Sequence, residues 1–443
     1  MKGKYNIRYI ILISFISALG GYLFGFDFAV ISGALPFLKE QFNLNAYWEG
    51  FTTGSLALGC MMGCFVAGRL SETYGRKMAL MTSAIIFAFS SLVMAFAPGL
   101  TVFISARFIA GIGVGMASML SPMYIAEVSP AEVRGRMVSL NQLAIVTGIF
   151  VTNLVNYSLR NNGEDAWRWM FGLGAIPAAL FFAGVLFLPE SPRWLIKAGR
   201  SDKAKQVLSL IGDNDFASGT LNDIQQTLSG EIKSSYRLAL KKPFVGAVIA
   251  GVGLAVLQQF SGINVVFNYT TTIFESMGFT KDDQLMQTVF IGAVNLFFTF
   301  LAIGLVDKIG RKPIMLTGFI GLAVLYILIA QFLVISPFAA TAFLLAAIGL
   351  FASTLGPVTW VLISEIFPNK VRGSATSIAV ISLWAAYFIL TFTFPILANA
   401  MGGISNTFYV YAGVCIAGAL FMWTKIRETK GVTLEQMDTL FVH

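Results

Sequence analysis

The feature that most constrains this chain is a series of twelve long apolar segments separated by polar stretches. Each segment has about 20 residues or more, which is the length an α-helix needs to cross the hydrocarbon core of a bilayer. Only 12% of the residues are charged, about half the share in an average soluble domain. Continuous apolar runs also argue against a membrane barrel, because barrel strands alternate polar and apolar residues. The sequence therefore predicts an all-α membrane protein with twelve transmembrane helices.

The predicted spans fall into two groups of six around one long polar segment. They lie at 9–31, 47–70, 78–97, 101–123, 138–158 and 168–188, and then at 244–275, 284–306, 312–334, 338–366, 373–397 and 405–425. The polar segment carries Leu221, Ile224, Leu228 and Ile232 at helical spacing, which predicts short amphipathic helices. We expect an N-terminal half at 1–188, a linker at 189–243, a C-terminal half at 244–425 and a tail at 426–443.

Basic residues are distributed unevenly between the two sides of the membrane. Lys39, Arg160, Arg168 and Lys281 are the ones that fall on one side, and Arg107 lies within a span. The rest of the 30 Lys and Arg residues occupy the N-terminus, alternate loops and the tail. By the positive-inside rule, both termini and the linker are predicted to be cytoplasmic. The net charge of +8 therefore indicates membrane orientation and no binding of nucleic acid.

Several motifs occur once in each predicted half. The segment 127–135 recurs as 365–373, Glu190-Ser191 recurs as Glu428-Thr429, and Gly75-Arg76-Lys77 recurs as Gly310-Arg311-Lys312. Two of these three repeats share one offset, and the third differs from it by only three residues. The repetition predicts two pseudo-symmetric six-helix halves that descend from one ancestral unit.

The motifs resemble those of the sugar porters in the major facilitator superfamily. They are the segment 68–77, the segment 189–195, Gln258-Gln259 with Gly262-Ile263-Asn264, Gly356-Pro357, and the segment 428–431. Within that family the chain looks most like bacterial proton-coupled pentose and hexose symporters. The resemblance implies the major facilitator fold, a monosaccharide and protons as partners, alternating access, and a place as a monomer in the lipid bilayer of a bacterial inner membrane.

Asp27 is the one acidic residue expected within a span, since the other 21 of the 22 Asp and Glu residues are assigned to loops or helix ends, and Arg107 is the one basic residue expected at membrane depth. A carboxylate buried in a bilayer is costly, so it indicates a functional site by default. Burial favours the protonated carboxyl group, whereas a nearby guanidinium favours the ionised form. A structural ion pair is the alternative. In the resembled family, a matching Asp and Arg are associated with proton coupling, which favours symport over uniport.

A sugar site needs neutral hydrogen-bonding groups and an aromatic face in a mostly apolar cavity. The seventh span concentrates such groups, and Gly262 is expected to interrupt its helix. The resemblance implies substrate binding by Gln142, Gln258, Gln259, Asn264, Asn295, Gly356, Trp360 and Trp384. Each amide could instead form a hydrogen bond between helices.

The chain departs from bacterial xylose symporters at four positions. Those proteins have a tyrosine where this chain has Asn268 and an asparagine where it has Tyr387. They also have glutamines at the positions of Ile149 and Leu383. The substrate class is therefore predicted, whereas pentose, hexose and polyol remain open.

Charged residues at the predicted cytoplasmic helix ends are candidates for a gate. They are Glu72, Arg76, Glu127, Arg134, Asp307, Arg311, Glu365 and Arg372. We expect them to bridge the halves when the inner side is closed, although each exposed pair contributes only ~0–1 kcal/mol. The alternative is that they only fix the topology.

No enzymatic, cofactor or metal site is expected. Cys60 and Cys64 lack the spacing of a metal site, and His443 is the only histidine. The glycines at 111, 113 and 115 lie in a membrane span, where they favour close helix packing. The remaining functional alternatives are a facilitative sugar or polyol uniporter and a sugar sensor that does not transport.

Overall fold

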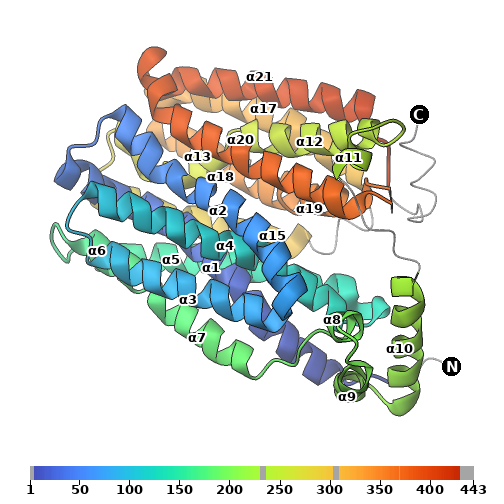
Figure 1. Ribbon diagram of the computed structural model, residues 1–443. Helices are drawn as coiled ribbons and strands as arrows, with labels where there is room; N and C mark the ends of the chain where they lie inside the picture. The colour runs from blue at the N-terminus through green and yellow to red at the C-terminus, as the bar shows by residue number, and fades with distance from the viewer. Residues whose placement is uncertain (1–3, 230–235, 303–308, 369, 430–443) are drawn as a thin grey trace. The chain divides into compact units, whose positions relative to one another are not determined.

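A computed structural model of the chain describes residues 4–229, 236–302, 309–368 and 370–429. Over these ranges the secondary structure is helical, apart from one isolated bridge between Tyr5 and Gly212. Twelve helical segments are long and apolar enough to cross a membrane, which confirms the predicted number of spans. Figure 1 labels the helices in chain order.

The first six spans occupy the chain up to residue 186. They are α1 (Ile7–Phe42), α2 (Ala46–Tyr74), α3 (Arg76–Ala95), α4 (Leu100–Val128), α5 (Ala131–Leu159), and α6 (Ala166–Gly172) with α7 (Ala175–Leu186). The first helix continues eleven residues past its predicted end at 31, through Pro36. This extension packs against protein, since Ala34, Leu35 and Leu38 are fully buried.

The last six spans contain more interruptions. They are α12 (Val245–Phe260) with α13 (Ile263–Asn268), α15 (Lys281–Ala302), α17 (Arg311–Ile335), α18 (Pro337–Ser353) with α19 (Leu355–Glu365), α20 (Arg372–Ala400), and α21 (Ile404–Lys425). The short helix α14 (Thr270–Ser276) follows α13. The seventh predicted span, 244–275, is therefore three helices. The predicted interruption at Gly262 is confirmed, since α12 ends before this residue, which has a left-handed φ of 86°.

The linker contains the predicted short helices. They are α8 (Pro192–Lys197), α9 (Ser201–Ile211), α10 (Asn214–Ser229) and α11 (Tyr236–Ala239). Trp194, Leu195 and Ala204 form a small buried cluster, and Leu221 of α10 packs against it. The predicted position Ile232 lies outside the described residues.

The chain forms two compact units that are each described by themselves. The first contains residues 1–27, 59–149 and 168–233, and the second contains 28–58, 150–167 and 234–443. In the first unit α3 packs along α4 and α7, and in the second unit α17 packs along α21 (Figure 1). The second unit thus combines the end of α1, the start of α2 and the end of α5 with the last six spans.

Candidate functional site

Asp27 and Arg107 form a fully buried ion pair in the first unit. The Arg107 Nη2 atom lies 3.7 Å from Asp27 Oδ2, and their side chains are 1% and 0% exposed. Arg107 also lies over the ring of Phe171, 5.5 Å from its centroid. Within the described ranges, neither oxygen of Asp27 accepts a hydrogen bond, and Nε and Nη1 of Arg107 donate none. Charge, and not hydrogen bonding, holds this pair together.

Protonation would change how strongly Arg107 holds this carboxyl group. An ionised carboxylate buried without a cation would carry a large desolvation cost, so it must stay beside Arg107. A protonated carboxyl group is neutral and can leave the guanidinium. Binding of a proton by Asp27 would therefore allow α1 and α4 to move apart at this point.

A row of amides follows the interruption between α12 and α13 in the second unit. Gln259 donates from Nε2 to Gln258 Oε1 over 2.9 Å, and Asn264 donates from Nδ2 to Gln259 Oε1. All three side chains are buried. The structure therefore brings together the three amides that the sequence predicted in the seventh span.

Gly262 makes this arrangement possible. Its φ of 86° belongs to the left-handed region, which favours glycine. A Cβ atom there would lie 2.5 Å from Cγ of Tyr411. The turn places Gln258 and Gln259 at the end of one helix and Asn264 at the start of the next. The side-chain amide of Asn264 therefore contacts that of Gln259, five positions earlier in the chain.

Asn268 extends the polar row and pairs with Tyr387 of α20. Its Nδ2 atom donates to the Asn264 carbonyl over 2.7 Å and lies 2.8 Å from the Tyr387 hydroxyl. The Tyr387 ring contacts Trp384 at 5.8 Å and Phe28 at 5.6 Å between centroids. Two of the four positions expected to differ from bacterial xylose symporters, Asn268 and Tyr387, thus contact each other, which the sequence did not predict.

Within the described ranges, the other predicted substrate residues form no hydrogen bond to the row of amides. Asn295 and Trp384 are buried, whereas Trp360 is 39% exposed. Gly356 lies in the first turn of α19, and the break between α18 and α19 is at Thr354. Gln142 belongs to the first unit and the other seven residues to the second.

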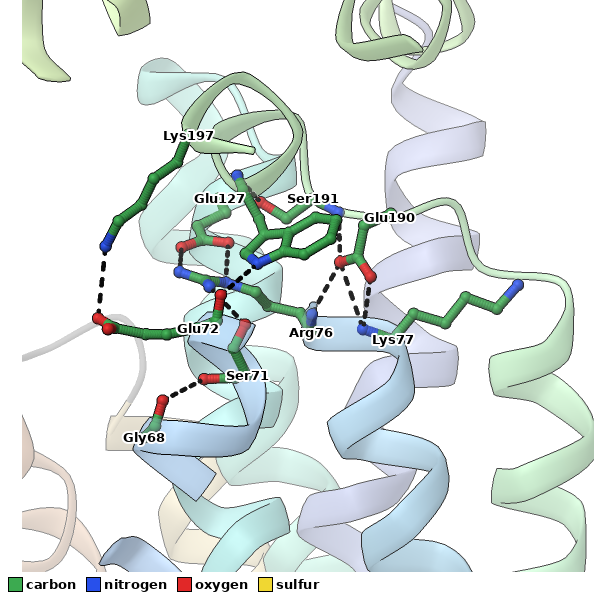
Figure 2. A network of polar contacts seen from close by, with 10 residues as sticks. Gly68, Ser71, Glu72, Arg76, Lys77, Glu127, Glu190, Ser191 and Lys197 are labelled. Atoms are coloured by element: carbon green, nitrogen blue, oxygen red, sulfur yellow. Dashed lines mark hydrogen bonds and ion pairs between the residues drawn. The ribbon is translucent and has the colours of Figure 1, made fainter. Parts of the chain in front are cut away.

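A polar network joins α2, α3, α4 and the segment before α8 in the first unit (Figure 2). Arg76 donates from Nε and Nη2 to the two oxygens of Glu127, over 3.0 and 2.9 Å. It also donates from Nη1 to the Ser71 carbonyl over 3.0 Å. The predicted gate residues Arg76 and Glu127 are therefore paired with each other.

Glu190 caps the start of α3 in the same network (Figure 2). Its carboxylate accepts the N–H groups of Arg76, Lys77 and Ser191, the nearest at 2.8 Å. Burial raises the pKa of Glu190, and these N–H donors oppose that rise by stabilising the carboxylate. Gly75 has a φ of 97°, and a Cβ atom there would lie 2.1 Å from Glu190 Oε2. This cap therefore needs a glycine before the helix.

The second unit repeats this arrangement at the start of α17. Arg311 donates from Nη2 to Glu365 Oε1 over 3.2 Å. Glu428 accepts the N–H groups of Arg311 and Lys312, both over 3.0 Å. Thr429 donates to Glu365 Oε2 over 2.6 Å. The helix-capping role of Glu190 and Glu428 was missed, although their common offset in the repeat was a signal for it.

The remaining described gate candidates contact residues of their own unit. Glu72 is 3.5 Å from Lys197 Nζ, Arg134 donates to the Ser129 carbonyl, and Arg372 donates to the Phe367 carbonyl. Asp307 lies outside the described residues. The ion pairs Arg76–Glu127 and Arg311–Glu365 each lie within one unit. Bridging between the halves stays a prediction.

The sequence also missed Glu49, a buried acid in the first turn of α2. Its carboxylate accepts a hydrogen bond from Thr272 over 3.3 Å. Its position near the start of an apolar run gave no sign of burial. Among the described residues, no group of three or more His, Cys, Asp or Glu side chains could hold a metal ion.

The chain is similar to known transporters of sugars and related compounds. The profile of the family described as "Sugar (and other) transporter" matches residues 13–441. The D-xylose-proton symporter of Escherichia coli K12 is 39% identical, and the alignment covers 100% of this chain and 97% of that protein. The major myo-inositol transporter of Bacillus subtilis is 37% identical, with 98% and 94% covered. An inward-open structure of the xylose transporter from E. coli matches with a TM-score of 0.86 at 36% identity, covering 98% of this chain and 100% of that one.

Proposed function

This chain belongs to the family of sugar (and other) transporters, and we propose that it is a proton-coupled monosaccharide symporter that works by alternating access. The family consists of multi-pass membrane proteins with the major facilitator fold, and the matched relatives are transporters and not enzymes. Symport of a sugar with a proton comes from the printed activity of relatives such as the D-xylose-proton symporter. The buried pair of Asp27 and Arg107 is the observation in this chain that carries the proposal.

Asp27 is proposed as the proton-binding group and Arg107 as its partner. Accumulation against a gradient requires that protonation change the conformational equilibrium. Among the described residues, Arg107 is the ionic partner that a protonated Asp27 would leave. In Asp27→Asn the side chain is permanently neutral. Sugar counterflow should persist, whereas accumulation of sugar against its gradient should be lost.

The experiment compares Asp27→Asn with Asp223→Asn in proteoliposomes. Asp223 is an exposed acid on α10, so its loss should leave both activities unchanged. Uptake driven by an imposed pH gradient and equilibrium counterflow are measured for each protein. If Asp27→Asn still concentrates sugar with the pH dependence of the parent, Asp27 does not couple transport to protons. Sugar uptake that does not acidify the vesicles in the parent protein would instead favour a facilitative uniporter.

We propose that the sugar is bound by Gln142, Gln258, Gln259, Asn264, Asn295, Gly356, Trp360 and Trp384. The buried amide row of Gln258, Gln259 and Asn264 supports this assignment, because neutral amides can donate to and accept from sugar hydroxyls. A competition panel of unlabelled pentoses, hexoses and inositols against one labelled sugar would identify the substrate. Inositols belong in the panel because one relative is a myo-inositol transporter.

The charged helix ends are proposed as the cytoplasmic gate. The candidates are Glu72, Arg76, Glu127, Arg134, Asp307, Arg311, Glu365 and Arg372. The tight pairs Arg76–Glu127 and Arg311–Glu365 support a role in fixing neighbouring helix ends. In a closed inner gate, these side chains would exchange some of their local partners for partners on the other half.

The same proposal includes the organisation and location of the protein. Residues 1–188 and 244–425 form the two six-helix halves, 189–243 form the cytoplasmic linker and 426–443 the cytoplasmic tail. The protein lies as a monomer in the lipid bilayer of a bacterial inner membrane, with both termini in the cytoplasm. The distribution of basic residues supports this orientation. The ends of α1 and α5 and the starts of α2 and α15 are then outer ends.

A further inference from the structure

Three of the four basic residues on the proposed outer side form ion pairs between distant helices of the second unit. The pairs are Lys39–Glu275 at 3.2 Å, Lys281–Glu40 at 3.1 Å and Arg160–Asp282 at 3.5 Å. Each pair joins α1 or the end of α5 to α14 or α15. The positive-inside rule disfavours basic residues on this side of the membrane. That three of them form ion pairs between helices therefore suggests that these pairs have a function.

One of these lysines also faces a buried acid. Lys39 Nζ lies 3.9 Å from Glu49 Oε2, and the side chain of Glu49 is 8% exposed. Glu49 accepts a hydrogen bond from Thr272 of α14, three residues before Glu275 in the same helix. Lys39 therefore lies between the carboxylate of α2 and the carboxylate of α14.

The acids of the ion pairs just described are far more exposed than Glu49. Glu40 and Asp282 have side chains that are 71% and 65% exposed, and the side chain of Glu275 is 57% exposed. Pairs of this kind contribute little, because water solvates the separated charges well. Loss of Lys39 is different, since it would leave the buried Glu49 without its nearest cation.

Helices α1 and α14 are also in contact deeper in the membrane than these ion pairs. The Thr271 hydroxyl of α14 donates to the carbonyl of Ser32 of α1 over 2.8 Å, and both residues are buried. The outer half of α1 thus lies directly against α14. Sugar that enters from outside must pass between helices that are in contact here.

We propose that Lys39, Glu49 and Glu275 form an outer latch, which holds the outer ends of α1 and α2 against α14 and closes the route from outside to Ser32. This inference rests on the proposed orientation and on alternating access. The latch is made in the outward-closed state represented by these contacts and must break when the outer side opens. Weakening it shifts the resting population towards the outward-open state.

The test measures how fast Ser32→Cys reacts with a membrane-impermeant thiol reagent in right-side-out vesicles. Ser32 suits a reporter because it is buried and its hydroxyl has no hydrogen-bond partner among the described residues. The background protein has Cys60, Cys64 and Cys415 replaced by alanine. Sugar and a proton gradient are absent, so the readout does not depend on coupling.

Lys39→Gln should raise the reaction rate about 10-fold. The matched control is Lys281→Gln, which removes the same side chain from a pair of nearly the same length but with an exposed partner, and should change the rate less than 2-fold. The double variant Lys39→Gln with Glu49→Gln should react more slowly than Lys39→Gln alone, because it also removes the unpaired buried carboxylate. This partial reversal also shows that Lys39→Gln is not simply unfolded.

Two further variants separate the possible failures. In Gly50→Leu the new Cβ would lie 2.2 Å from the Phe392 carbonyl oxygen, so α2 cannot keep its closed packing on α20 and the rate must rise. Asn162→Cys lies in an exposed loop on the outer side and should react in every background. If Asn162→Cys does not react, the proposed orientation fails. If it reacts and Gly50→Leu leaves the Ser32→Cys rate unchanged, the closed route to Ser32 is wrong. Equal rates in Lys39→Gln and Lys281→Gln would overturn the latch.

Discussion

Replacing Gly262 by alanine should damage both stability and sugar binding, because this residue forms the turn between α12 and α13. Its φ of 86° costs a residue with a Cβ atom about 1–2 kcal/mol. The new Cβ would also lie 2.5 Å from Cγ of Tyr411, well inside van der Waals contact. Tyr411 is itself buried, so its ring has little room to move. Overpacking of this kind adds about 1–3 kcal/mol.

The two contributions can be separated with Gly278. It has a φ of 83°, nearly the same as Gly262, and a Cβ there would meet no atom within 4 Å. Gly278→Ala should therefore cost only the backbone contribution, about 1–2 kcal/mol. Gly262→Ala should cost about 2–5 kcal/mol in total, from strain and overpacking together.

The assay measures thermal unfolding and sugar binding for both variants in detergent. Relief of the clash would move Gln258 and Gln259 relative to Asn264, whose amides now meet. We expect the dissociation constant of Gly262→Ala to rise at least tenfold, or about 1.4 kcal/mol, with little change in Gly278→Ala. Equal losses of stability in the two variants, with unchanged affinity in Gly262→Ala, would refute the assignment of this turn to the sugar site.

Three other predictions concern the substrate residues and the linker. Gln259→Ala and Asn264→Ala should each raise the sugar dissociation constant about 10- to 100-fold, because about 1–3 kcal/mol is lost when sugar hydroxyls are desolvated without partners; titration calorimetry that finds normal affinity in both would remove this row from the site. Trp360→Ala should weaken binding more than Trp360→Phe, since phenylalanine keeps an aromatic face; unaltered calorimetric affinity in Trp360→Ala would place this residue elsewhere. The N–H groups of Phe216 and Lys4 lower the pKa of Asp213, so its stabilising effect should be present above the unfolded pKa of about 4 and be lost as the pH falls through the lower folded value. Unfolding midpoints between pH 2 and 5 should thus depend less on pH in Asp213→Asn, and identical profiles would contradict this.

The twelve spans were predictable because transfer of a long apolar helix into lipid dominates all local preferences. The interruptions depend on local chemistry and were only partly predictable. Gly262 was expected to break its helix and does. The predicted span 338–366 is interrupted at Thr354, just before Gly356-Pro357, and a break at that residue was not predicted. Pro357 then lies in the first turn of α19, where its missing N–H group costs little.

The site shows the same division between local and distant determinants. The pairing of Asp27 with Arg107 was predictable, since two opposite charges at one membrane depth have few other partners. The pairing of Asn268 with Tyr387 joins residues 119 positions apart and depends on how α13 packs on α20. The burial of Glu49 likewise depends on Lys39 and Thr272, which come from two other helices. Such contacts have no periodicity or spacing by which one sequence could reveal them.

The repeated motifs and the unrepeated ones have different physical roles. Glu190 and Glu428 cap α3 and α17 in the same way, because a helix start needs acceptors for its free N–H groups in either half. The first helix of each half has no such shared constraint at mid-depth. There α1 carries Asp27, whereas the corresponding segment α12–α13 carries Gln259 and Asn264. We infer that duplication produced the common helix ends, and that divergence of the buried faces left a titratable group in one proposed half and neutral hydrogen-bonding groups in the other. A symporter needs both, since a carboxylate can bind a proton and amides can bind a sugar at any pH.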